Sequence, residues 1–113
     1  MRFINSSVHG VLDYLVVVAL VLVSIAVGLS GLAAAIIYLM ASALLAITLI
    51  TAFPSGALKL LPLPAHSNVE LWMGMSLLVC PWIFGFADDP MALNVFIVSG
   101  FALLALRLFS KAD

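Results

Sequence analysis

The chain has 113 residues, of which 66% are hydrophobic and only 8% are charged, and its formal net charge is −1. A typical soluble domain is about 45–50% apolar and about 25% charged, so a soluble fold of this length could not bury so much apolar surface. We therefore predict a protein embedded in the lipid bilayer, and nothing in its charge indicates nucleic acid as a partner. The single cysteine, Cys80, excludes an intramolecular disulfide and a cysteine-rich metal site.

Four apolar stretches are long enough to cross a bilayer, which takes about 20 residues in a helix. Their hydrophobic residues do not alternate, and backbone groups in lipid must be paired within a helix or a closed barrel. We predict an all-α integral membrane four-helix bundle. The first stretch follows Arg2 as a signal sequence would, but His9 and Asp13 interrupt it, so we expect it to be retained. The expected spans are residues 7–28, 32–53, 65–86 and 90–109.

Turn-forming residues lie between the expected spans. A tight turn at 28–31 joins the first two, Pro54 and Gly56 end the second, and Asp88-Asp89-Pro90 precedes the fourth. Proline is tolerated in a first helical turn, which suits Pro62 and Pro64 ahead of the third span. The linker 54–64 is short and apolar, so we expect it along the membrane surface. Candidate caps for the first helix are Asn5, Ser6 and Ser7.

The charges predict an orientation. With four spans, both termini and the 54–64 linker lie on one side of the membrane, and the four cationic residues all fall there, whereas Asp88 and Asp89 fall on the other side. Cationic loops face the cytoplasm, so both termini should be cytoplasmic. The cationic residues are Arg2, Lys59, Arg107 and Lys111.

The stretch VHGVLDYL returns in altered form as AHSNVELW. A shift of 57 residues maps His9 onto His66 and Asp13 onto Glu70, and it maps Gly28 and Ser42 onto a glycine and a serine as well. This pattern predicts the duplication of a two-helix unit within a single membrane domain. Because each unit has an even number of spans, the two repeats should be parallel. The expected organisation is repeat 1 at about 6–53, linker 54–64 and repeat 2 at about 65–111.

The repeat brings polar residues to equivalent places in two helices. His9 and Asp13 lie one turn apart on one helix face, and so do His66 and Glu70. A carboxylate that faces lipid is costly, so these faces should turn inward, toward each other. The same inward face should include Leu20 and Ser24 in the first span, and Met73, Leu77 and Pro81 in the third.

Two interpretations of these four residues remain open. In the favoured one, His9, Asp13, His66 and Glu70 form hydrogen bonds that clasp the two repeats. In the other, two imidazoles and two carboxylates converge as a site for a divalent metal ion or as a proton relay. Axial ligation of a haem by the two histidines is a narrower variant, which requires a wide apolar slot.

The stretch VCPWIFGF, together with VHGVLDYL, LKLLPLPAH and the following ADDP, resembles the SPW-repeat family of small bacterial membrane proteins, which is named for a Ser-Pro-Trp motif. The resemblance covers essentially the whole chain. It implies a multi-pass protein of the bacterial inner membrane that is built from two-helix repeats, without implying an activity. Cys80, Pro81 and Trp82 stand at the motif, so cysteine replaces its serine, and the first repeat has Val23-Ser24-Ile25 instead. We interpret the motif as structural, with a kink at Pro81 and Trp82 at the interface.

No nucleotide-binding loop, nucleophile with its base, or cofactor fingerprint is present in the sequence, so we expect neither an enzyme nor a bound cofactor. The first functional hypothesis is a structural or accessory membrane component, as a homo-oligomer or as a subunit of a larger membrane complex. The alternative is a small transporter or a metal- or proton-binding module that uses His9, Asp13, His66 and Glu70, and a quinone or haem site is a weaker third. Small residues at Ser42/Ala46 and Ser99/Gly100 are expected to be helix-packing surfaces.

Overall fold

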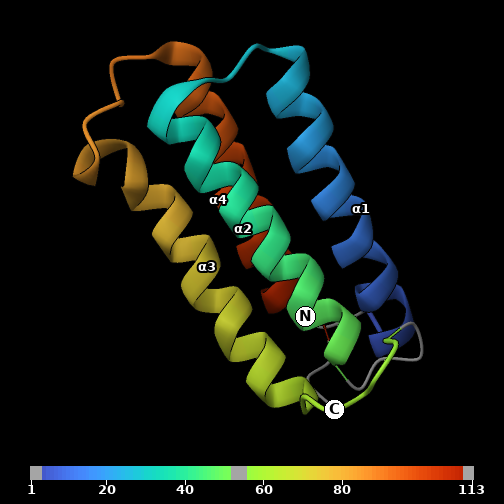
Figure 1. Ribbon diagram of the computed structural model, residues 1–113. Coiled ribbons are helices and arrows are strands. Elements are labelled where there is room, and N and C mark those ends of the chain that lie inside the picture. The colour runs from blue at the N-terminus through green and yellow to red at the C-terminus, as the bar shows by residue number, and fades with distance from the viewer. Residues whose placement is uncertain (1–3, 52–55, 111–113) are drawn as a thin grey trace.

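The computed structural model describes residues 4–51 and 56–110, and its fold is an all-α bundle of four helices that run side by side (Figure 1). Each helix has 20 or 21 residues, which at about 1.5 Å per residue gives a length close to the hydrocarbon thickness of a bilayer. The helices are α1 (Ser6–Ala26), α2 (Gly31–Ile50), α3 (Leu63–Ile83) and α4 (Pro90–Phe109).

Three of the four helices are long and apolar enough to cross a membrane, namely α1, α2 and α4. The third expected span, which corresponds to α3, does not reach the same hydropathy. The cause is local, because the first two turns of α3 hold His66, Ser67, Asn68 and Glu70.

The predicted helix ends are correct to within about three residues, and the deviations have physical causes. Asn5 is the cap of α1, and its side chain accepts a hydrogen bond from the Val8 N–H at 2.9 Å. The second helix ends at Ile50 rather than Phe53, which lies outside the described residues, as does Pro54. Its terminal carbonyls are bonded by the linker, for example that of Ile50 by the Leu61 N–H at 2.6 Å.

The third helix begins two residues before the predicted span and ends three residues earlier. It starts at Leu63 because Pro64 fits the first helical turn, where an N–H would have no partner. It ends at Ile83, and Gly85 follows with a φ of +78°, just as Gly28 follows α1 with a φ of +70°. Such positive φ angles favour glycine, which explains the glycine at both positions.

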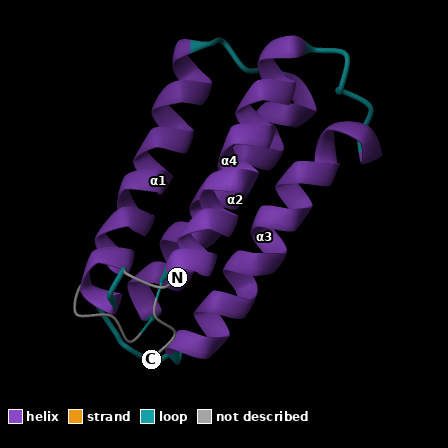
Figure 2. Ribbon diagram, turned by 180° about the vertical axis from the view of Figure 1, so that it is seen from behind, coloured by secondary structure: helices purple, strands orange, loops and turns teal. Residues whose placement is uncertain are grey.

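The chain forms two helical hairpins, α1–α2 and α3–α4, and the helices pack more extensively within each hairpin than between the hairpins. The turns of both hairpins lie at one end of the bundle, and the linker lies at the other end with the start of α1 and the end of α4 (Figures 1 and 2). At that end the Ile4 N–H donates to the Phe109 carbonyl at 2.9 Å. The arrangement agrees with the predicted common side of the linker and the two chain ends.

Burial confirms the predicted inward faces. The buried residues of α1 include Leu20 and Ser24 beside the polar pair, and those of α3 include Met73, Leu77 and Pro81. The small-residue prediction is confirmed only in the second hairpin, where Ser99 and Gly100 are buried. Ser42 and Ala46 lie on the exposed side of α2, so within this chain they form no packing surface.

Candidate functional site

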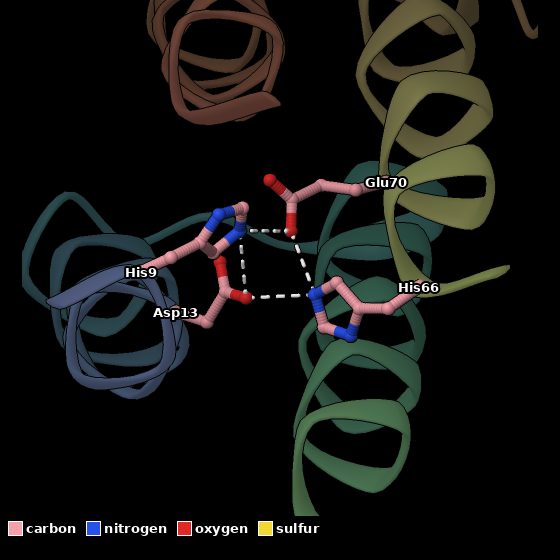
Figure 3. A group of neighbouring side chains, drawn as sticks. All are labelled: His9, Asp13, His66 and Glu70. Atoms are coloured by element: carbon pink, nitrogen blue, oxygen red, sulfur yellow. Dashed lines mark hydrogen bonds and ion pairs between the residues drawn. The ribbon is translucent and has the colours of Figure 1, made fainter. Parts of the chain in front are cut away.

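Four polar side chains that were singled out in the sequence meet in the interior of the bundle, near the end that holds the linker. His9 and Asp13 come from α1, and His66 and Glu70 come from α3 (Figure 3). All four are at most 2% exposed. One nitrogen or oxygen atom of each lies within 4.8 Å of the other three, so we call this group the quartet.

The quartet forms a ring in which histidine and carboxylate alternate. His66 Nε2 lies 2.8 Å from Asp13 Oδ2 and 2.9 Å from Glu70 Oε2. His9 Nε2 lies 3.2 Å from the same two oxygens. Each histidine therefore contacts one acid on its own helix and one acid on the other hairpin, as the dashed lines in Figure 3 show.

The local geometry follows from the sequence spacing. Residues four apart in a helix lie on the same face, so each histidine is stacked over the carboxylate of its own helix. Both pairs begin three residues after the first residue of a helix, and the two helices start at the same end of the bundle. The two imidazole rings meet edge to face, with ring centroids 5.7 Å apart.

A fifth residue, Thr51, belongs to the site, and the sequence analysis did not identify it. Its hydroxyl oxygen lies 2.7 Å from His66 Nδ1. The same hydroxyl donates a hydrogen bond to the carbonyl of Ile47, one turn back in α2. A hydroxyl has one hydrogen, so the bond to Ile47 makes Thr51 an acceptor for His66, and this arrangement assigns the proton of a neutral His66 to Nδ1.

The second oxygens of the two acids have a different environment. Asp13 Oδ1 and Glu70 Oε1 are buried, and neither has a hydrogen-bond partner among the described residues. An unsatisfied buried acceptor typically costs about 1–3 kcal/mol. Each acid therefore uses one oxygen to contact both histidines, while its second oxygen has no protein partner among the described residues.

A haem does not fit between the two histidines. A porphyrin held by both imidazoles needs a wide apolar slot beside the two Nε2 atoms. In this structure the space beside those nitrogens holds the carboxylate oxygens of Asp13 and Glu70 at 2.8–3.2 Å.

The Cys80-Pro81-Trp82 motif lies apart from the quartet. Cys80 is 14 residues after His66 on the same helix, which corresponds to about 21 Å along the axis. Cys80 is buried, and Trp82 is 61% exposed, as expected for a side chain that faces the membrane interface. The kink predicted at Pro81 stays a prediction.

Comparison of the chain with known protein families, with curated proteins and with solved structures finds no match.

Proposed function

We propose that this chain is a structural or accessory protein of the bacterial inner membrane, in which the quartet clasps two parallel helical hairpins together. The observation that supports the proposal is that two hydrogen bonds of the quartet connect one hairpin to the other. His9 bonds to Glu70 and His66 bonds to Asp13, so both histidines reach from one hairpin to the acid of the other.

The weak packing between the hairpins supports this role. Helices contact each other extensively within α1–α2 and α3–α4, whereas α1 with α4 and α2 with α3 make few contacts. Within a membrane there is little hydrophobic driving force between helices, so polar bonds and close packing must hold them together. The quartet supplies two short polar contacts between hairpins that otherwise pack weakly against each other.

The distribution of exposed residues supports a bilayer-spanning bundle with α3 as the fourth span. The polar residues His66 and Glu70 of α3 point into the bundle, while its outer side presents Trp72, Val79 and Ile83. The average hydropathy of α3 is thus lowered in part by His66 and Glu70, which would not contact lipid, while the exposed Asn68 lies in the second turn, close to the end of the helix. The proposed orientation, with cytoplasmic termini, depends on the four cationic residues of the sequence.

The resemblance to the SPW-repeat family and the 57-residue repeat agree with this proposal. Gly28 and Gly85 are related by the repeat, and both end a helix with a positive φ. A structural component can act as a homo-oligomer or as a subunit of a larger membrane complex, and the many large apolar side chains on the outer faces suit both.

The stability of the detergent-purified protein tests the clasp. We expect Glu70→Gln to lower the free energy of unfolding by about 3 kcal/mol, because it leaves buried imidazoles without one of their charged partners. Asp88→Asn is the matched control, since Asp88 is an exposed acid at the opposite end of the bundle, and it should change stability by less than about 0.5 kcal/mol. Equal stability of Glu70→Gln and wild type would contradict the clasp.

A further inference from the structure

The ring formed by the quartet has fewer hydrogens than hydrogen-bond contacts. Four nitrogen-to-oxygen contacts of 2.8–3.2 Å link its members. An imidazole Nε2 carries at most one hydrogen, and ionised carboxylates carry none. Two hydrogens at most must therefore serve four contacts, and each would be divided between two oxygens.

The contact with Thr51 further limits the hydrogens that His66 can supply to the ring. With the proton of a neutral His66 assigned to Nδ1, where it bonds to Thr51, Nε2 presents a lone pair. That lone pair faces Asp13 Oδ2 at 2.8 Å and Glu70 Oε2 at 2.9 Å. Three electron-rich atoms at such distances repel one another unless a positive species lies between them.

The four contacts around the ring suit a metal ion. A first-row transition cation lies about 2.0–2.2 Å from nitrogen and oxygen ligands, which places neighbouring ligands about 2.8–3.6 Å apart in square or tetrahedral geometry. The four contacts of the ring, at 2.8, 2.9, 3.2 and 3.2 Å, fall in this range. Charge also balances, because two neutral imidazoles, two carboxylates and a dication sum to zero in a buried site.

We propose that the quartet binds one divalent first-row transition cation of the zinc type, with His9 Nε2, His66 Nε2, Asp13 Oδ2 and Glu70 Oε2 as ligands. The inference deepens the proposed clasp, since it depends on the same convergence of α1 and α3. A metal-bound histidine usually donates its other ring N–H to a fixed acceptor, and Thr51 holds that position for His66.

The burial of the site indicates that the ion is held rather than passed through. Every ligand residue is at most 2% exposed, and four protein ligands complete the coordination of a structural zinc site, whereas catalytic sites keep one position open. The ion would join the two hairpins, so its binding would add to their stability.

Zinc titration of the full chain tests this inference. The protein is purified in detergent with a histidine-free tag, stripped with EDTA, and titrated with Zn²⁺ against a competing chelator. We expect one zinc ion per chain and a higher melting temperature with zinc. We expect Glu70→Gln and Asp13→Asn each to weaken binding at least about tenfold. Asp88→Asn and Cys80→Ser should bind as wild type does.

Absence of stoichiometric binding to wild-type protein, or equal affinity in Glu70→Gln and Asp88→Asn, would overturn the inference. If the ligand variants fail to fold, X-ray absorption spectroscopy of zinc-loaded wild-type protein identifies the atoms that bind the zinc ion. Two imidazoles with two oxygens support the site, and a sulfur ligand or a shell of six oxygens contradicts it. Stability measurements in EDTA test the clasp independently of the metal site. If Glu70→Gln is less stable than wild type in EDTA but wild type binds no zinc, the clasp is supported and the metal site is contradicted.

Discussion

His66 connects more of the molecule than any other member of the quartet in the hydrogen bonds described above. It contacts Asp13 of α1, Glu70 of its own helix and Thr51 at the end of α2. Three of the four helices thus meet on one imidazole ring. Its two ring nitrogens have separate roles, because Nδ1 bonds to the Thr51 hydroxyl and Nε2 faces the two acids.

Replacing Thr51 by valine tests the first of these roles. Valine matches threonine in shape but removes the acceptor of His66 Nδ1, which leaves a buried N–H without its partner. We expect a loss of about 1–3 kcal/mol in the free energy of unfolding. Chemical or thermal unfolding in detergent, followed by circular dichroism, measures it.

Thr48→Val is a matched control for this change. Thr48 lies one turn earlier in α2, is also fully buried, and its hydroxyl donates only to the Leu44 carbonyl at 2.7 Å. That bond lies within one helix, so its loss should cost less than about 1 kcal/mol. Equal losses in the two variants would show that Thr51 does not support His66.

The sequence predicted four of the five residues at the site, and the reason is their repetition. The spacing of four residues, twice, within apolar helices indicated two polar pairs that had to face inward. Thr51 has no such signal, since the shift of 57 residues maps it onto Leu108. Its contact with His66 depends on how the linker returns to the end of α2, and helical periodicity does not describe that return.

At the scale of the helices, the apolar stretches and their turns predicted the number and order of elements, whereas helix ends depended on local bonds. The fourth helix was predicted with its observed bounds because Asp89 caps it and Pro90 fixes its first turn. The second helix ended early because linker N–H groups, such as that of Leu61, bind its last carbonyls.

The close packing of α3 on α4 depends on two facing glycines. A Cβ atom on Gly100 would lie 2.9 Å from the Gly74 carbonyl oxygen and 2.8 Å from two carbons of the Leu78 side chain. The leucine can move, but the helix backbone cannot move without separating the helices. Small residues at this crossing therefore set the distance between α3 and α4.

We expect Gly100→Ala to destabilise the protein by about 1–2 kcal/mol, although alanine favours a helix more than glycine does, because overpacking outweighs that gain. Thermal unfolding in detergent measures the change. Ser99→Ala, in the same turn and without an added methylene, should be close to neutral. A Gly100→Ala protein more stable than wild type would show that the helices can separate at no cost.

For the whole molecule, the two hairpins share their direction and their helix-ending glycines but differ in how they are packed. Ser99 is buried whereas its counterpart Ser42 is exposed, so the proposed duplication does not make the halves equivalent in burial. Sequence repetition predicted the positions of the polar pairs. It could not predict that Ser99 would be buried and Ser42 exposed, because that difference depends on how one hairpin sits against the other.

The proposed orientation can be tested in intact cells with a thiol reagent that does not cross membranes. In a Cys80→Ser background, Asp88→Cys should be labelled from outside, because the α3–α4 turn is expected on the outer side. Leu58→Cys, an exposed residue of the linker at the other end of the bundle, should be labelled only after the membrane is permeabilised. The reverse pattern would invert the topology.

The coupling between Asp13 and His66 tests most directly whether the quartet joins the hairpins. A double-mutant cycle with Asp13→Asn and His66→Gln, measured by unfolding in EDTA, should give a coupling free energy of about 1–3 kcal/mol, since the residues are buried and 2.8 Å apart. Asp13→Asn combined with Asp89→Asn, at the far end of the bundle, should be additive within about 0.5 kcal/mol. Additivity of the Asp13 and His66 changes would contradict the clasp.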